Sequence, residues 1–316
     1  MSWNECTPSF YKQNKMERTL IPLINKSFST IGLGCVTFGR EIDQQASFSL
    51  MDYAIKNGIT FFDTAAAYGD GASEEFIGSW MADRHSASDS ILVSTKVLPP
   101  YTPKKIIGSV DQSLKRLGTD AIDLLYLHRW DSSIETLDAL NTLNDLIKIG
   151  KVKMLGVSNF NAEQLGTVIR LQKDNGFELF RTIQNNNNFA VSGITKEIVQ
   201  ICVDHDIKIV SYSPLGAGFL TGKYKNGVKE GTRFSLIKGH QDIYFNETSF
   251  QRLNKLQKIS ALTGYSTWHL ALTWALHQPY ITSVLVGGCS TKQLEQAFSA
   301  LAFYDTDIFN ELELDQ

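Results

Sequence analysis

Short apolar segments alternate with longer amphipathic segments along most of the chain. The short segments are rich in β-branched and aromatic residues, and several are continuously apolar, which is typical of parallel strands covered on both faces. Eight of them are predicted to be strands: 30–33, 60–63, 91–96, 124–128, 154–158, 181–184, 208–212 and 283–286.

The longer segments between them repeat apolar residues at helical spacing. In 103–117, for example, Ile106, Val110 and Leu117 fall on one helical face, Pro103 suits the first turn, and Gly118 follows the end. Asn161 and Gln164 have the spacing of a capping box. Helices are predicted over 103–117, 134–149, 161–172, 194–205 and 291–301.

A strand followed by a helix, repeated eight times, favours a (β/α)8 TIM barrel over an open sheet. No linker divides the chain, so we expect one barrel domain over 18–316 after an N-terminal extension over 1–17. Segment 19–31 is predicted to be a hairpin that turns at 25–27 and precedes the barrel. The long loop over 215–250 follows the seventh strand, and loops of this length are usually functional or disordered.

Composition excludes several classes of protein. The chain has 316 residues, of which 43% are hydrophobic and 20% charged, with a net charge of −3 and a pI near 6.1. This balance is that of a folded globular protein. It shows no basic patch or run, so we expect no nucleic-acid partner.

Cysteine usage and hydropathy indicate the compartment. The four cysteines include no C-x-x-C pair, so a disulfide framework or zinc cluster is not expected and a reducing cytoplasm is the simplest location. The first residues lack the apolar run of a signal peptide. The most apolar stretch, 268–289, is interrupted by His269, His277 and Pro279, so no membrane span is expected.

Polar residues fall where the predicted strands end, which is where barrel enzymes place their active sites. Asp63, Lys96 and His128 end three successive strands, and Tyr68 follows Asp63 closely. Alone, the aspartate could be a helix cap and the histidine a structural residue. Together they form one set at one rim of the barrel, which favours a catalytic role.

The chemistry of this set is that of carbonyl reduction. A tyrosine hydroxyl has a pKa near ~10, and an adjacent lysine ammonium would lower it by about 1–3 units. An aspartate would hold the lysine, and a histidine could hydrogen-bond the same substrate oxygen. Such a group can protonate a carbonyl oxygen as hydride reaches the carbon. No side chain donates hydride, so a nicotinamide cofactor is required.

Six motifs lie around these residues in a fixed order, and with them the sequence resembles the aldo-keto reductase family over about residues 17–301. The motifs occupy 62–69, 71–78, 113–120, 122–128, 156–160 and 213–223. The resemblance implies a catalytic tetrad of Asp63, Tyr68, Lys96 and His128, in which Tyr68 is the general acid or base.

The resemblance also implies a cofactor site. Ser158, Asn159 and Gln184 would hydrogen-bond the nicotinamide carboxamide, and Tyr212 would stack on the ring. Residues of the loop after the seventh strand would follow the pyrophosphate: Ser213, Leu215, Gly216, Leu220 and Lys223. The chain has no G-x-G-x-x-G motif, which argues against a Rossmann domain.

The adenosine end departs from the family pattern. Gly287, Ser290 and Gln293 match its last motif, but the usual closing Glu-Asn pair is replaced by 296–297, Gln-Ala. Asn187 stands where the family often has a tyrosine. Arg233 and Lys292 could meet a 2′-phosphate, so NADPH is the expected cofactor, with NADH as the alternative. Ser290 could instead be a plain helix cap to Gln293.

We therefore expect an NADP(H)-dependent oxidoreductase that reduces aldehydes or sugar-like carbonyls, or runs the reverse reaction. The alternative is a cofactor-binding sensor or regulatory barrel with little turnover, since the family includes channel-associated members. A metal-dependent hydrolase using Asp63 and His128 is disfavoured, because the other histidines are predicted on helices or loops, and no metal site is expected.

The substrate pocket is less defined by the sequence. Phe38, Trp130 and the 215–250 loop are candidates for its wall. The short tail after 301 suggests an open mouth that suits small polar or sugar-like aldehydes better than steroid ketones. The pattern indicates no particular oligomeric state.

Overall fold

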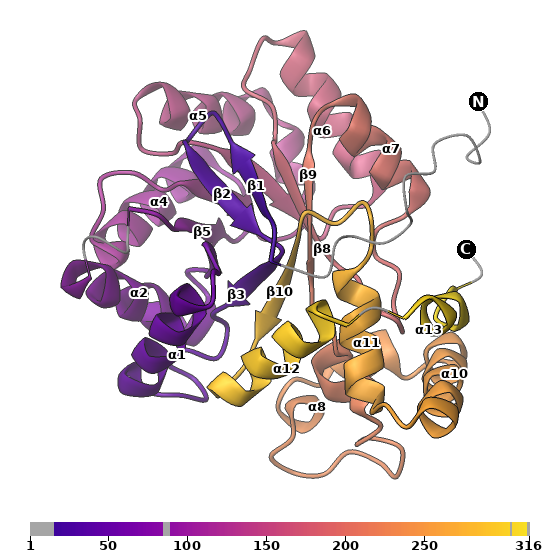
Figure 1. Cartoon of the computed structure of the whole chain (residues 1–316). Coiled ribbons are helices and arrows are strands. Elements are labelled where there is room, and N and C mark those ends of the chain that lie inside the picture. The colour runs from indigo at the N-terminus through magenta and orange to yellow at the C-terminus, as the bar shows by residue number, and fades with distance from the viewer. Residues whose placement is uncertain (1–15, 85–88, 304, 315–316) are drawn as a thin grey trace.

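The computed structural model describes residues 16–84, 89–303 and 305–314. Eight parallel strands close into a barrel in the order β10-β3-β4-β5-β6-β7-β8-β9, and helices surround it (Figure 1). This confirms the TIM barrel, and each predicted strand is present with bounds shifted by at most one or two residues. The strands are β3 (Ile31–Gly34), β4 (Phe61–Asp63), β5 (Leu92–Val97), β6 (Leu124–Leu127), β7 (Leu155–Ser158), β8 (Thr182–Asn186), β9 (Lys208–Tyr212) and β10 (Ser283–Gly287).

The helices begin and end largely where the amphipathic pattern predicts. Gly118 ends one of them in the left-handed conformation, with φ of 64°, and Asn161 and Gln164 form the predicted capping box. The helices are α1 (Gln44–Lys56), α2 (Ala72–Asp83), α4 (Pro103–Leu117), α5 (Leu137–Lys148), α6 (Ala162–Asp174), α7 (Lys196–Asp204), α10 (Glu247–Thr263), α11 (Thr267–Leu276), α12 (Thr291–Leu301) and α13 (Thr306–Glu311).

The helix predicted over 134–149 is interrupted near its start. A short 3₁₀ helix, η2 (Ser132–Glu135), is followed by Thr136 in an extended conformation, with ψ of 140°. The Thr136 side chain accepts a hydrogen bond from the backbone N–H of Ala139 and thereby caps α5. A capping threonine within the apolar pattern therefore shortens the helix.

The N-terminal hairpin forms, but its turn precedes the predicted one. β1 (Arg18–Ile21) pairs antiparallel with β2 (Lys26–Ser29), and Ile21 faces Lys26 in the register. The chain turns over 22–25 rather than 25–27. Pro22 has a fixed φ and no N–H, which suits a turn, and Asn25 takes the left-handed conformation with φ of 51°.

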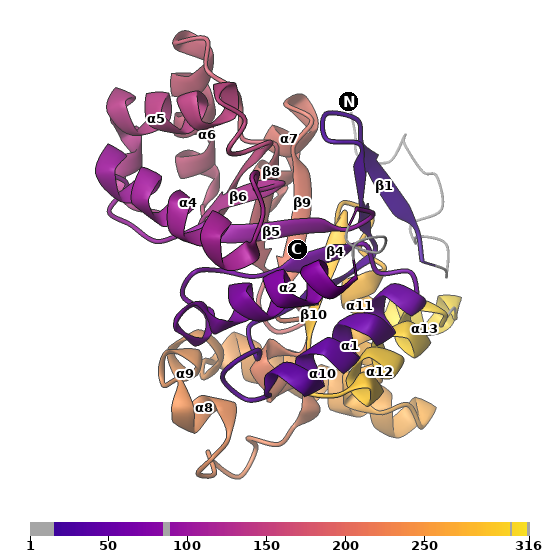
Figure 2. The ribbon, with the colours of Figure 1, turned by 90° about the vertical axis from the view of Figure 1, so that its left-hand side faces the viewer.

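The hairpin closes the end of the barrel where the strands begin. Phe28 is fully buried inside the barrel and meets Phe61 edge-on, with ring centroids 4.7 Å apart. Ser283, the first residue of β10, donates its hydroxyl to the backbone oxygen of Ser29 at 2.7 Å. The hairpin lies at the opposite end of the molecule from the short helix α8 (Arg233–Leu236) (Figures 1 and 2). The barrel strands therefore end on the side of α8, which is the end where barrel enzymes place their active sites.

The long segment over 215–250 is not structureless. It contains the 3₁₀ helix η3 (Gly216–Thr221), α8, α9 (Gly239–Tyr244) and the start of α10. Aromatic rings hold these pieces together, since Tyr224 stacks on Phe234 with centroids 4.0 Å apart and Phe219 stacks on Tyr244 at 5.6 Å. These aromatics recur at no helical or strand period, which is why the pattern predicts a loop.

Candidate active site

Asp63 and Lys96 form a buried ion pair inside the mouth of the barrel. Asp63 ends β4 and its register partner is Ser94, so Lys96, two residues further along β5, points to the same face. Lys96 Nζ lies 2.6 Å from Asp63 Oδ2, and their side chains are 1% and 3% exposed. The ammonium also donates to the backbone oxygen of Thr64 at 2.8 Å and to Tyr68 Oη at 3.3 Å.

The carboxylate of Asp63 is fixed from its other side as well. Its Oδ1 accepts hydrogen bonds from Ser94 Oγ at 2.7 Å and from Gln184 Nε2 at 2.8 Å. Both oxygens therefore have partners, which offsets the cost of burying the charge. This arrangement holds the lysine ammonium in one position beside the tyrosine.

Tyr68 and His128 face each other across the same mouth. Tyr68 begins the 3₁₀ helix η1 (Tyr68–Gly71), directly after the loop that leaves β4. Its ring is nearly perpendicular to the His128 ring, at 80°, with centroids 5.9 Å apart. Lys96 Nζ lies 4.9 Å from the centre of the Tyr68 ring. The structure thus brings together all four residues of the proposed tetrad.

The charge states of this group follow from burial and from the ion pair. Burial lowers the pKa of Lys96, but Asp63 and Tyr68 outweigh this effect, so its pKa is raised and the ammonium stays charged. Burial raises the pKa of Tyr68, and the opposing effect of Lys96 is smaller. Lys96 acts on this pKa in the expected direction, but the expectation of a net lowered pKa for Tyr68 is wrong, because desolvation outweighs the ammonium.

His128 is a neutral imidazole in this site. Burial, followed by the charges of Lys96 and Arg129, lowers its pKa to about 3. Its Nδ1 is buried and makes no hydrogen bond to the described residues. A neutral imidazole can donate a hydrogen bond to a substrate oxygen without adding a charge.

The residues expected at the nicotinamide adjoin this group. Ser158 Oγ donates to the backbone oxygen of Gln184 at 2.8 Å, and Tyr212 Oη donates to Asn159 Oδ1 at 2.6 Å. Asn159 has a φ of 60° and donates through Nδ2 to the backbone oxygen of His128 at 3.0 Å. Gln184 meets the tetrad directly through Asp63, a contact that the sequence pattern does not indicate.

The turn after β9 takes the left-handed backbone conformation at several positions. Ser213, Gly216 and Gly218 all have positive φ, with values of 56°, 58° and 91°. A Cβ atom on Gly218 would lie 2.7 Å from Lys223 Nζ, so a glycine lets the ammonium rest against the chain. Leu215 is half-buried at this turn. The Leu220 side chain is fully buried and packs in the larger of the two apolar cores that the described residues form.

The β10–α12 turn holds the residues expected at the adenosine end. Gln293 Oε1 accepts from the backbone N–H of Cys289 at 2.6 Å, and Ser290 Oγ makes no capping hydrogen bond. The alternative of a plain cap from Ser290 to Gln293 is therefore wrong. The backbone of Gly287 packs against that of Gly34, where a Cβ atom on Gly287 would meet the Gly34 oxygen at 3.3 Å.

Three residues that the sequence analysis did not single out, Thr37, Arg40 and Glu41, lie at this end of the site. Glu41 Oε1 accepts from Arg233 Nη1 at 3.1 Å and from Arg40 Nη2 at 2.6 Å. Thr37, in the same loop after β3, donates to the backbone oxygen of Gly288 at 2.9 Å and ties the loop to the β10–α12 turn. Their position just after a barrel strand is the signal that could have found them.

The two aromatic residues expected to line the substrate pocket differ in where the fold places them. Trp130 is half-buried beside the mouth and meets Phe160 edge-on, with centroids 5.1 Å apart. From the sequence, Phe38 is expected to line the mouth, but its side chain is fully buried in the larger of the two apolar cores. Trp130, two residues after His128 in the chain, remains the candidate for an apolar wall.

Three further structural findings concern metals, thiols and membranes. Within residues 16–84, 89–303 and 305–314, no group of three or more His, Cys, Asp or Glu side chains is placed to hold a metal ion. The thiols of Cys35, Cys202 and Cys289 are free, and Cys6 lies outside the described residues. No helix in the described part of the chain has the length and apolar character needed to cross a bilayer.

Two relatives that this chain resembles are named as reductases. Norsolorinic acid reductase B of Dothistroma septosporum is 29% identical over 90% of this chain and 77% of its own length. L-glyceraldehyde 3-phosphate reductase of Escherichia coli O157:H7 is also 29% identical, over 84% and 81% of the two chains.

A third relative carries a different kind of name. A probable voltage-gated potassium channel subunit beta of Arabidopsis thaliana is 28% identical over 86% of this chain and 87% of its own length. The sequence model of the Aldo/keto reductase family matches residues 30–313, which is most of the chain and includes the whole barrel. The chain belongs to the aldo/keto reductase family.

Proposed function

We propose that this protein is an NADP(H)-dependent oxidoreductase that reduces small polar or sugar-like aldehydes to alcohols, or catalyses the reverse oxidation. Membership of the family and the reductases among the relatives support an oxidoreductase. The observation that carries the proposal is the contact between the buried Lys96 ammonium and the Tyr68 hydroxyl, opposite a neutral His128.

The chain's own residues supply the acid of the reaction. A reduced nicotinamide would supply the hydride. Tyr68 holds its proton at neutral pH, because burial raises the pKa of its hydroxyl. An alkoxide oxygen is a far stronger base than a phenolate, so Tyr68 gives up the proton as charge develops on the carbonyl oxygen. Lys96 then stabilises the phenolate, and Asp63 keeps Lys96 charged and in place.

His128 positions the substrate in this proposal. With a pKa of about 3, the imidazole is neutral throughout the physiological range and can donate one hydrogen bond without competing as an acid. A carbonyl oxygen held between Tyr68 and His128 would have two converging donors. Trp130 would contact the rest of a small substrate.

The residues around the mouth fit a nicotinamide dinucleotide. Asn159 hydrogen-bonds both Tyr212 and the backbone oxygen of His128, so these two side chains would hold the nicotinamide next to the tetrad. Lys223 and the left-handed turn at 216–218 offer a cation and a close-approach backbone for a pyrophosphate. Arg233, which pairs with Glu41 in the loop after β3, would meet a 2′-phosphate and so favour NADPH over NADH.

One observation favours a second candidate function. The similarity to a probable voltage-gated potassium channel subunit beta fits a barrel that binds the cofactor and acts mainly as a sensor or regulatory subunit. The two candidates differ in turnover, since both bind a reduced nicotinamide and only an enzyme consumes it with an added aldehyde.

The test is the absorbance of reduced nicotinamide, followed with a panel of short aldehydes, aldoses and steroid ketones. We expect turnover with the small polar substrates, a poor reaction with steroids and a lower Kd for NADPH than for NADH. Tight cofactor binding without turnover on any substrate would favour the regulatory candidate. A steroid with a KM far below those of the small aldehydes would contradict the proposed substrate class.

A further inference from the structure

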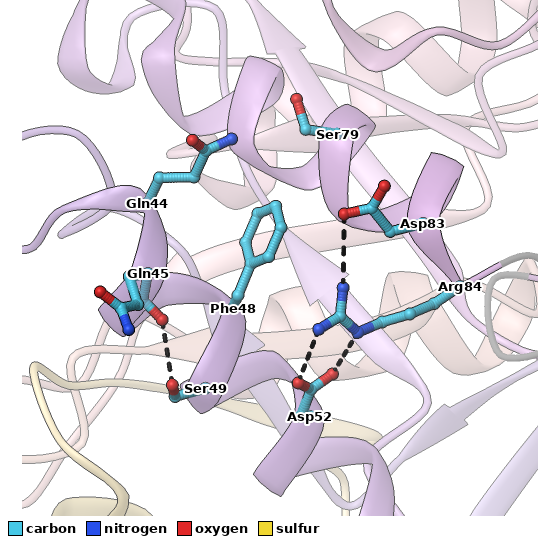
Figure 3. A pocket seen from close by; sticks show the side chains of 8 residues that line it. All are labelled: Gln44, Gln45, Phe48, Ser49, Asp52, Ser79, Asp83 and Arg84. Atoms are coloured by element: carbon cyan, nitrogen blue, oxygen red, sulfur yellow. Dashed lines mark hydrogen bonds and ion pairs between the residues drawn. The ribbon is translucent and has the colours of Figure 1, made fainter.

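Three clusters of charged side chains stand out in the described part of the molecule. They differ in the ratio of positive to negative groups and in how accessible the negative group is. In the groove between α1 and α2, Arg84 lies between two carboxylates, 2.6 Å from Asp52 and 3.8 Å from Asp83 (Figure 3). One cation shared by two anions offers no surplus for a negatively charged ligand. This groove therefore shows no anion site.

The second cluster lies at the hairpin end of the barrel. Lys26 of β2 and Lys153 bind the two oxygens of Asp123 at 2.7 and 2.9 Å, and the backbone N–H of Val93 donates to the same carboxylate at 3.2 Å. The Asp123 side chain is only 7% exposed. The Asp123 carboxylate already has three donors and is nearly buried, so a ligand would gain little by displacing it, and this cluster fastens the hairpin to the barrel.

The third cluster has two cations around one accessible anion. Glu41 binds Arg40 through two hydrogen bonds of 2.7 and 2.6 Å, and Arg233 through one of 3.1 Å. The three side chains are 35%, 27% and 25% exposed for Arg40, Glu41 and Arg233. Glu41 can therefore turn into solvent at small cost and leave two guanidinium groups facing a common point.

This cluster lies at the adenosine end of the proposed cofactor site. Its loop is tied to the β10–α12 turn by the Thr37 hydrogen bond to Gly288. Burial raises the pKa of the Cys289 thiol in that turn, Glu41 raises it further, and Arg233 and Arg40 act in the opposite direction. The cluster thus adjoins the segment between Gly287 and Ser290.

We propose that Glu41 determines the choice between NADPH and NADH by competing with the 2′-phosphate for Arg40 and Arg233. A phosphate monoester is a dianion that guanidinium groups bind through paired hydrogen bonds, so it takes the place of the carboxylate. A ribose 2′-hydroxyl is instead a donor, and Glu41 accepts its hydrogen bond in the way acidic residues recognise NAD. The inference rests on the proposed function.

Two consequences follow from this competition. NADPH binding in the native protein includes the cost of displacing Glu41, so the preference for NADPH is smaller than two arginines alone would produce. Removing the carboxylate frees both arginines for the phosphate and removes the acceptor for the 2′-hydroxyl. The preference for NADPH should therefore rise in a variant that lacks this charge.

The experiment is cofactor binding, measured as quenching of protein fluorescence by NADPH and by NADH. The variant is Glu41→Gln, which keeps the side-chain length. Glu178→Gln is the matched control, because Glu178 also pairs with an arginine, Arg181 at 3.9 Å, in the segment before β8. We expect Glu41→Gln to increase the ratio of the NADH Kd to the NADPH Kd by on the order of tenfold. Glu178→Gln should leave it unchanged.

The outcomes separate this inference from the proposed function. If the native protein binds neither cofactor, the proposed function fails and the inference fails with it. If it binds both and Glu41→Gln leaves the ratio unchanged, the inference is overturned while the proposed function stands. Arg233→Gln provides a second measurement that should lower the ratio. A ratio that rises in that variant would also contradict a phosphate site at this cluster.

Discussion

Replacing Lys96 with methionine should destabilise the barrel as well as stop the chemistry. Methionine has a similar length and fills the same space, but it leaves the Asp63 carboxylate without its cation. That carboxylate is 3% exposed and keeps the hydrogen bonds from Ser94 and Gln184. Breaking a buried pair from one side costs about 3–5 kcal/mol, and the two remaining donors place the cost near the lower value.

A second substitution isolates the cause. In the double variant Asp63→Asn/Lys96→Met neither member of this buried pair is charged, and the asparagine oxygen still accepts from Ser94 and Gln184. Removing both charges is close to neutral in many buried pairs. The double variant should therefore recover at least half of the stability lost by Lys96→Met, while carbonyl reduction stays absent in both.

Differential scanning calorimetry at one scan rate measures these effects. A change of 1 kcal/mol shifts the Tm of a domain of this size by roughly 2 °C, so Lys96→Met should lower it by about 6 °C. The double variant should lower it by less than about half of this amount. A single variant as stable as the native protein, or a double variant no better than the single one, would refute the account of the ion pair.

Two further predictions concern His128 and the interior of the barrel. An NMR titration should find the His128 ring neutral down to about pH 4, since its folded pKa is about 3. The stability that the neutral ring contributes should be present above pH ~6.5 and should decline as the pH falls toward 3. A ring that titrates at pH ~6.5 would contradict this. Gly156→Ala should lower the stability by about 1–3 kcal/mol or prevent folding, because the new Cβ would lie 2.2 Å from Thr182 Oγ1 and 2.5 Å from Tyr126. Gly108→Ala is the control: it has open space at its Cβ and should stabilise α4. Equal Tm values for the two variants would show that the interior is less tightly packed than described.

The barrel and the gathering of the tetrad follow from local patterns in the sequence. A strand covered on both faces leaves a continuous apolar run, and a helix buried on one face leaves apolar residues at helical spacing. These two patterns predict the strands and the helices. Asp63, Lys96 and His128 lie at or next to the ends of the consecutive strands β4, β5 and β6, so closing the barrel is enough to bring them together.

Other features depend on contacts that no local pattern encodes. The 215–250 segment is held by aromatic rings such as Tyr224 and Phe234, whose spacing has no period. Arg40 and Glu41 meet Arg233 only because two distant loops lie together. The direction of the pKa shift at Tyr68 depends on how completely the fold removes its hydroxyl from water, so the neighbouring lysine alone predicts the wrong sign.

The most direct test of the central claim is single-turnover reduction of an aldehyde by Tyr68→Phe. This substitution removes the hydroxyl that Lys96 contacts at 3.3 Å and keeps the ring that faces His128. With NADPH bound to equal saturation, we predict that hydride transfer slows by on the order of 10²–10⁴-fold, equivalent to about 3–5 kcal/mol, while the Kd of NADPH changes little. A variant that retains most of the native rate would show that another group protonates the carbonyl oxygen.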